Sequence, residues 1–173
     1  MAGYVIHLAV GEEYIRNYPN EIKNYDDFID GVIYPDSVSD KSLTHYGPKS
    51  SKVFLKDYFT ERDIEDDFSK GYFLHLVTDY LFYNKFLEFF STKYIYNDYD
   101  ILNKDLIKEF SIKIPEKVKD KVFYNEGETK ILDLEKTIEF IRDAAKYNLN
   151  DIKDAIYKDD KFWLEIRPLK KID

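Results

Sequence analysis

The chain is short of several residue types. Its 173 residues include no cysteine, one tryptophan, one methionine and three histidines. Without cysteine it can form no disulfide, no thiolate metal site and no cysteine nucleophile. No apolar run reaches the ~18 residues of a membrane span, because His75 and Asp79 interrupt the best candidate. Residues 1–7 lack the basic segment of a signal peptide. We therefore expect a cytoplasmic protein without a transmembrane segment.

Positive charge is also in deficit. The chain has 26 basic and 34 acidic residues, which gives a net charge of −8. An acidic surface repels phosphate backbones, so we expect no broad nucleic-acid-binding face. A small phosphorylated substrate stays compatible with this charge, because a metal ion can supply local positive charge. The oligomeric state leaves no mark in the sequence.

What the chain has in quantity is apolar and aromatic side chains. Hydrophobic residues make up 44% of it and aromatic residues 17%, including 16 tyrosines and 13 phenylalanines. This composition excludes disorder, and the length suits one domain over residues 1–173. We expect a metal-site half of about residues 1–95 and a helical packing half of about residues 96–173.

The spacing of apolar residues predicts an all-α, single-domain helical bundle. Asn24, Asp133 and Asn150 are suited to cap helices, and Pro35 is expected to end the second helix. The polar stretch 34–51 is predicted to be a loop, and residues 162–168 to be extended. The predicted helices cover residues 4–17, 25–33, 52–59, 66–90, 103–110, 116–124, 134–147 and 151–158.

The predicted helix over residues 66–90 is apolar on nearly all sides, which places it at the centre of the domain. His75 and Asp79 are four residues apart, so both point the same way. An ionised aspartate buried there without a partner would cost several kcal/mol. Asp79 therefore needs a cation, a strong set of hydrogen-bond donors, or a metal.

The other two histidines also lie beside apolar segments or carboxylates. His7 lies in the first apolar helix, and His45 follows Asp36 by nine positions in the predicted loop. Imidazole and carboxylate groups are ligands of zinc, iron and manganese, and helical bundles build metal sites where their inner faces meet. The candidate metal ligands are His7, Asp36, His45, His75 and Asp79.

Three passages in residues 3–86 resemble the zinc-dependent phospholipase C family and its P1-type nuclease relatives. The first is an early helix with a histidine, Val5-Ile6-His7-Leu8-Ala9. The second leads from Gly31-Val32-Ile33-Tyr34-Pro35-Asp36 to Thr44-His45-Tyr46. The third is Gly71-Tyr72-Phe73-Leu74-His75 with Asp79 four positions later.

The resemblance implies a phospholipase C/P1 nuclease-like fold and a metal-dependent phosphoesterase. By matching position, Asp36, His45, His75 and Asp79 would hold one metal, and Asp79 would bridge to a second held partly by His7. Asp36 is also implied as the base for the attacking water. No His-x-x-x-Glu pair follows Asp79, so we expect one or two ions, not three. Zinc is expected, with iron, manganese or nickel as alternatives.

The substrate is then either a phospholipid headgroup or a smaller phosphate ester. Two other functions remain open. One is a non-catalytic helical protein in which a metal, or only His–Asp hydrogen bonds, acts as a structural staple. The other is an HD-type phosphohydrolase, which the absence of any His-Asp dipeptide disfavours. Because Asp36 is expected on a water-accessible loop, we predict that Asp79→Asn harms the protein more than Asp36→Asn.

Overall fold

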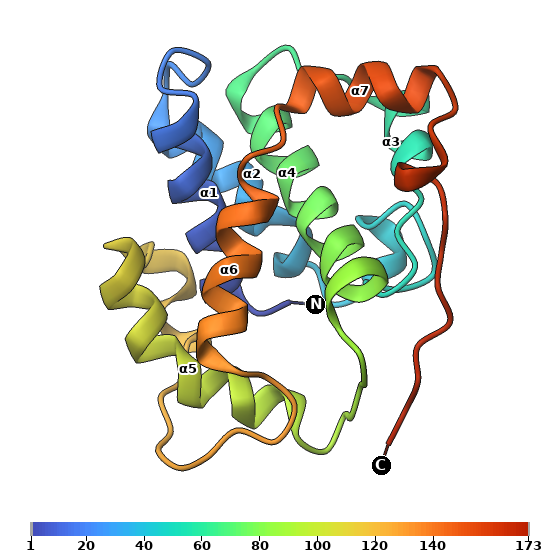
Figure 1. Cartoon of the computed structure of the whole chain (residues 1–173). Coiled ribbons are helices and arrows are strands. Elements are labelled where there is room, and N and C mark those ends of the chain that lie inside the picture. Colours follow the sequence, from blue (N-terminus) through green and yellow to red (C-terminus); the bar gives the residue numbers. More distant parts are fainter. Residues whose placement is uncertain (1, 173) are drawn as a thin grey trace.

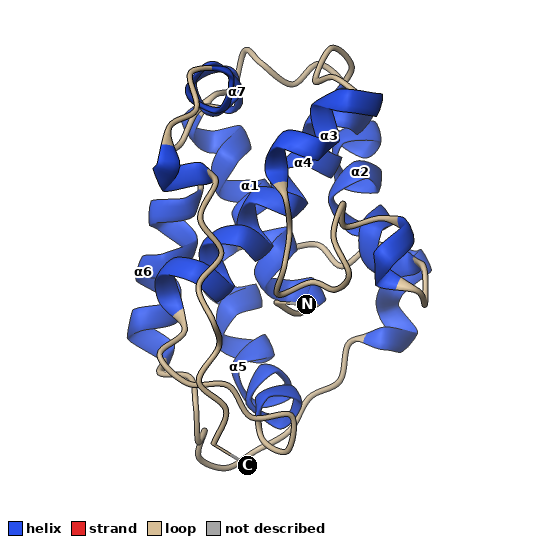
Figure 2. Ribbon diagram, turned by 90° about the vertical axis from the view of Figure 1, so that its right-hand side faces the viewer, coloured by secondary structure: helices blue, strands red, loops and turns tan. Residues whose placement is uncertain are grey.

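Helices dominate the computed structural model, which describes residues 2–172. Within that range no β-strand forms, and the extended backbone makes one isolated bridge, between Phe90 and Lys171. Figure 2 shows the helices joined by loops. The all-α prediction is confirmed. The α-helices are α1 Tyr4–Asn17, α2 Tyr25–Ser37, α3 Leu55–Glu61, α4 Asp67–Leu81, α5 Ile95–Phe110, α6 Leu134–Ala144 and α7 Leu149–Tyr157.

Helix α4 runs through the middle of the molecule, with α1 and α2 on one side and α3 on the other (Figure 1). All eleven of its residues from Gly71 to Leu81 are buried. The prediction of a central buried helix is confirmed, but its C-terminal end is not α-helical. The α-helix ends at Leu81, and a π-helical turn over Phe82–Phe86 follows. Such turns are rare and often lie near functional sites.

Two glycines allow α2 and α4 to cross in close contact. A Cβ atom on Gly31 would lie 2.0 Å from the carbonyl oxygen of Phe68, and one on Gly71 would lie 2.0 Å from that of Phe28. Any side chain at either position would push the backbones apart. The crossing therefore depends on glycine in both helices, and it brings the C-terminal end of α2 against the middle of α4.

Helix α2 continues past the position where Pro35 was expected to end it. Asn24 caps its start as predicted, accepting a hydrogen bond from the Asp27 backbone N–H at 3.1 Å. Its last turn is held by side chains instead of backbone donors. The Tyr4 hydroxyl and the Lys41 ammonium donate to the Asp36 carbonyl at 3.0 and 2.9 Å. The predicted loop therefore starts at residue 38, and Asp36 lies on a helix.

Helices α5 and α6 pack against α1, and so join the second half of the chain to the first. Here the predicted boundaries are less accurate. Helix α5 begins at Ile95 and not at residue 103, and Asn148, not Asn150, caps α7. Short 3-10 helices cover Lys41–Leu43, Glu116–Lys121 and Lys161–Trp163. In the described range, no helix is both long and apolar enough to cross a bilayer.

Candidate metal centre

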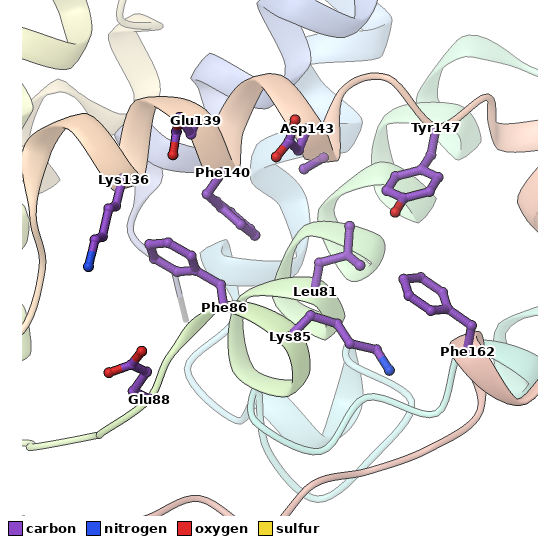
Figure 3. Close-up of a pocket in the computed structure, with 11 residues that line it drawn as sticks. Leu81, Lys85, Phe86, Glu88, Lys136, Glu139, Phe140, Asp143, Tyr147 and Phe162 are labelled. Atoms are coloured by element: carbon purple, nitrogen blue, oxygen red, sulfur yellow. The ribbon is translucent and has the colours of Figure 1, made fainter.

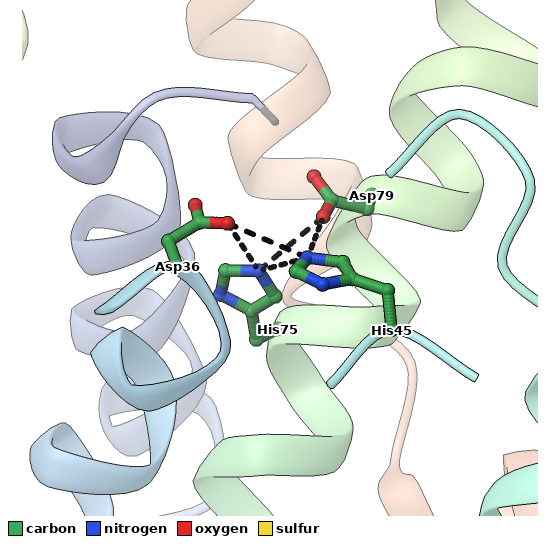
Figure 4. Close-up of side chains that lie close together, drawn as sticks. All are labelled: Asp36, His45, His75 and Asp79. Atoms are coloured by element: carbon green, nitrogen blue, oxygen red, sulfur yellow. Dashed lines mark hydrogen bonds and ion pairs between the residues drawn. The ribbon is translucent and has the colours of Figure 1, made fainter. Parts of the chain in front are cut away.

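Four predicted ligands meet in the space between α2, α4 and the loop that follows α2. Figure 4 shows Asp36 at the end of α2, His75 and Asp79 on α4, and His45 on the loop, with their polar ends facing one another. Their side chains are at most 1% exposed. One ligand atom from each lies within 4.8 Å of the other three. Together these side chains could hold a metal ion.

Five of the six distances between these atoms are close to the edges of a metal coordination tetrahedron. The two histidine Nε2 atoms are 3.2 Å apart. Asp36 Oδ1 lies 3.4 Å from Nε2 of His45 and 3.6 Å from Nε2 of His75, and Asp79 Oδ2 lies 3.2 and 3.3 Å from the same atoms. Tetrahedral zinc with bonds of ~2.0–2.2 Å requires ligand separations of about 3.3–3.6 Å. Five of the six separations are thus close to those of a zinc site, and the sixth, between the two carboxylate oxygens, is within 4.8 Å.

The outer nitrogens of both imidazoles are hydrogen-bonded. His75 Nδ1 lies 2.7 Å from the Val32 carbonyl oxygen, which can only accept, so Nδ1 carries the proton. His45 Nδ1 lies 3.0 Å from the Thr44 hydroxyl, whose own proton goes to the Pro35 carbonyl at 2.8 Å. His45 Nδ1 therefore also donates. In the neutral ring each Nε2 then presents a lone pair to the centre, as metal-binding histidines do.

The consequence is a buried set of acceptors without donors. Among residues 2–172, three carboxylate oxygens have no hydrogen-bond partner: both oxygens of Asp36 and Oδ2 of Asp79. A buried acceptor left unpaired costs about 1–3 kcal/mol, and native proteins rarely leave one so. Two carboxylates and two imidazole lone pairs at one point need a cation, which is either a bound metal or protons on the histidines.

His7 lies beside this group, on its other side. Its Nε2 is 3.1 Å from Asp79 Oδ1 and 3.8 Å from Asp36 Oδ2, the oxygens that face away from the first four ligand atoms. Its ring stacks on that of His75 with centroids 3.6 Å apart. Neither ring nitrogen of His7 has a well-formed hydrogen bond within the described residues. All five predicted ligands are therefore brought together.

The protonation of the centre follows from burial and from these charges. Burial and the neighbouring His75 lower the pKa of His7. Burial also acts to lower the pKa of His75, but the charges of Asp36 and Asp79 outweigh it and raise that pKa to about 9. Burial acts to raise the pKa values of Asp36 and Asp79, yet the histidines hold both well below the usual range. Both carboxylates are thus charged at neutral pH, as metal ligands must be.

One premise drawn from the sequence is wrong. Asp36 was expected on a water-accessible loop, but it lies in the last turn of α2 and its residue is 6% exposed. The reason is that Pro35 removes only one backbone donor, and side chains satisfy the carbonyls of that turn. Asp36 is therefore as much a buried residue as Asp79, and the predicted difference between their Asn variants loses its basis.

Several residues that shape the centre were missed from the sequence. Thr44 orients His45, the Tyr72 hydroxyl holds the Thr44 carbonyl at 2.6 Å, and the Ala2 backbone N–H donates to Asp79 Oδ1 at 3.1 Å. Thr44 directly precedes His45, so its hydroxyl was a usable signal. The other two contacts join residues 28 and 77 positions apart, and no local pattern reveals them.

No family model, curated protein or solved structure matches this chain. The resemblance to the zinc-dependent phospholipase C family therefore stays a prediction from the three passages quoted above. What the structure adds is that the residues in those passages which the resemblance implies as ligands form one centre.

Proposed function

We propose that the protein is a metal-dependent phosphoesterase with up to two zinc-type ions. The observation that carries the proposal is the placement of the carboxylate oxygens. Asp36 and Asp79 each present one oxygen to His45 and His75 and the other toward His7. Two carboxylates shared between a four-ligand site and a three-ligand site would suit a pair of ions. Metal pairs in hydrolases commonly lie close enough to share ligands in this way.

The incomplete second site is what favours catalysis. Catalytic zinc sites have three protein ligands and an open position, whereas structural sites are closed by four. His7 with the outer oxygens of Asp36 and Asp79 supplies three protein ligands. When bound, such ions lower the pKa of water and offset the negative charge on a phosphoryl group.

In this proposal the protein side chains would hold the ions, and their hydrogen bonds orient the ligand atoms. His45 and His75 keep their Nε2 lone pairs directed inward because their Nδ1 protons are engaged elsewhere. Asp36 is assigned as a bridging ligand. The resemblance also implies it as a base, but a general base works best with a pKa near the working pH, and that of Asp36 is held well below. Two imidazoles and two carboxylates suit zinc, and also iron, manganese or nickel.

The second candidate is a structural staple, and the burial of the centre favours it. The side chains of Asp36, His45, His75 and Asp79 are at most 1% exposed, which is typical of a closed site. In that case one metal, or protonated histidines alone, would tie α2 to α4 without any reaction.

His7 separates the two candidates experimentally. We would measure the zinc content of wild type and His7→Gln, and their hydrolysis of p-nitrophenyl phosphate and bis-p-nitrophenyl phosphate. With both sites filled, the phosphoesterase proposal expects two ions in wild type, one in His7→Gln, and hydrolysis by wild type only. A wild type that holds one ion, hydrolyses neither ester and is unaffected by His7→Gln would establish the staple instead.

A further inference from the structure

A second feature lies next to the metal centre: a cavity of about 320 Å³ that we call the lysine pocket. The residues that line it come from three distant parts of the sequence. The loop after α2 contributes Lys41, Lys49 and Ser50, the stretch around the π-helical turn contributes Tyr83 and Thr92, and the C-terminal segment contributes Lys171.

Three lysines line this pocket, and none of its lining residues among 2–172 is acidic, although the chain as a whole is acidic. The Lys41 ammonium donates to the carbonyls of Asp36 and Val38 at 2.9 and 2.7 Å, whereas the side chains of Lys49 and Lys171 are exposed and form no hydrogen bond or ion pair with residues 2–172. The ammonium groups of Lys49 and Lys171 lack a counter-charge in the described residues, and a bound anion would supply one.

A second cavity of the same molecule shows the contrast. Figure 3 shows Phe86, Phe140 and Phe162 in that cavity with charged side chains around them. Its two lysines, Lys85 and Lys136, are balanced by three carboxylates, Glu88, Glu139 and Asp143. A cavity lined by charges of both signs favours neither an anion nor a cation. Lysines without acidic neighbours in the lining therefore distinguish the pocket beside the centre from this second cavity.

The backbone fixes the C-terminal wall of the pocket. The Phe90 backbone N–H donates to the Lys170 carbonyl at 2.9 Å, and the Ile172 N–H donates to the Phe90 carbonyl at 3.1 Å. These two hydrogen bonds place Lys171 beside the segment that follows the π-helical turn. The pocket is thus formed by paired backbone rather than by a lysine on a free tail.

The pocket and the metal centre share a wall. Lys41 lines the pocket, and its Nζ lies 3.9 Å from Asp36 Oδ1. Tyr83 lines it too, and is only 3% exposed. An anion in the pocket would therefore lie next to the ligands.

We propose that the lysine pocket binds a phosphate dianion, so that the preferred substrate is a small phosphomonoester rather than a phospholipid with a zwitterionic headgroup. The inference rests on the proposed function and narrows its substrate class. A monoester phosphate carries close to two negative charges at neutral pH, whereas a diester carries one. The lysines, together with the hydroxyls of Ser50 and Ser51, offer the charge and the donors that a dianion needs.

Phosphate binding tests the pocket without any reaction. We would titrate inorganic phosphate by calorimetry into zinc-loaded wild type, Lys49→Gln/Lys171→Gln, Lys49→Arg/Lys171→Arg and the control Lys52→Gln. Lys52 is an exposed lysine of the same loop that does not line the pocket. The Gln pair should weaken phosphate binding at least about tenfold, because two charged donors are lost, while the Arg pair and the control retain it. Zinc content, measured in every variant, should not change.

The kinetic arm separates failure of the pocket from failure of the proposed function. The Gln pair should raise KM for p-nitrophenyl phosphate more than for bis-p-nitrophenyl phosphate. Equal effects on both esters would overturn the dianion assignment. Phosphate binding that the Gln pair does not weaken, or that disappears only on chelation, would overturn the pocket while hydrolysis persists. Lysine-dependent phosphate binding without hydrolysis of either ester would instead sink the phosphoesterase and keep the pocket as an anion site.

Discussion

Two buried aspartates, Asp98 and Asp79, are both 0% exposed but are satisfied in opposite ways. Asp98 accepts hydrogen bonds from the backbone N–H groups of three consecutive residues, Lys130, Ile131 and Leu132, at 2.6–3.1 Å. Asp79 receives one backbone N–H, from Ala2, and its Oδ2 faces histidine nitrogens without a hydrogen bond.

This contrast distinguishes a structural carboxylate from a candidate ligand. A carboxylate that ties a loop in place has its lone pairs filled by donors already in the fold, as Asp98 does. A carboxylate whose lone pairs converge with others on one point is incomplete without something from outside. Substitution of the two aspartates should therefore have different consequences for stability and for zinc binding.

The largest effect should come from the satisfied carboxylate. Asp98→Ala leaves the backbone N–H groups of residues 130–132 buried without an acceptor, so we expect the free energy of unfolding to fall by about 3–5 kcal/mol. Denaturant unfolding with and without zinc measures it. The loss should be the same in both conditions, and Asp98→Asn, which keeps one acceptor oxygen, should lose less. A zinc-dependent loss would mean that Asp98 is coupled to the centre.

Separating α2 from α4 should have the next largest effect. Gly31→Ala places a Cβ 2.0 Å from the Phe68 carbonyl, so the helices must move apart. We expect the free energy of unfolding to fall by about 3 kcal/mol. Zinc binding should also weaken, because Asp36 lies on α2 and His75 on α4. Gly11→Ala is the control, since its Cβ would come no closer than 3.4 Å to Val32.

Gly11→Ala should change stability by no more than about 1 kcal/mol and leave zinc affinity unchanged. If Gly31→Ala keeps full zinc affinity although it lowers stability, then the position of Asp36 does not depend on the close crossing. Calorimetric zinc titration of both variants decides this.

A smaller effect is expected from the unsatisfied carboxylates, and it should appear only with metal. At a zinc concentration about a hundredfold above Kd, binding should stabilise wild type by about 2.7 kcal/mol, or about 5–10 °C in Tm. Asp79→Asn and Asp36→Asn should both lose this increment, because both residues are buried and both face two histidines. Zinc content and Tm with and without a chelator are the measurements.

An Asp36→Asn variant that retains the whole zinc increment, beside an Asp79→Asn variant that loses it, would restore the asymmetry expected from the sequence. Such a result would also remove Asp36 from the proposed pair of shared ligands. An increment retained by both variants would leave the centre without a metal role.

The sequence predicted the elements that depend on local periodicity. Helix α1 matches residues 4–17, and the central buried helix follows from the apolar run around His75. The prediction from sequence failed where tertiary contacts override a local rule. Pro35 should end a helix, but the hydroxyl of Tyr4 and the ammonium of Lys41 satisfy the turn that contains it. Helix α5 starts two turns before the prediction because packing, not propensity, holds its first residues.

The candidate site divides in the same way. The five proposed ligands were found because histidine is rare in this chain and each one lies beside an apolar segment or a carboxylate. The hydrogen-bond partners of those ligands were not found. The partner of His75, for example, is the Val32 carbonyl, a backbone group whose position depends on the crossing of α2 and α4. The lysine pocket left no signal either, since its lysines come from segments more than 100 residues apart.

The smallest effect, and the most specific, is the change in stability per pH unit. In the metal-free protein the pKa of His75 is raised to about 9, so its charge contributes stability that is fully present below about pH 6.5 and lost as pH rises toward 9. Zinc binding needs His75 deprotonated, so the zinc-induced increment should instead grow as pH rises through the same window. The slope should be at most about 1.4 kcal/mol per pH unit for each proton released.

Denaturant unfolding from pH 6 to 8.5, with chelator and with zinc, should therefore give curves that diverge. The Asp98→Asn variant is the control and should shift both curves alike, because Asp98 touches no histidine. Parallel curves for wild type would show that zinc displaces no proton from His75, and that His75 is then part of a hydrogen-bonded staple rather than a ligand.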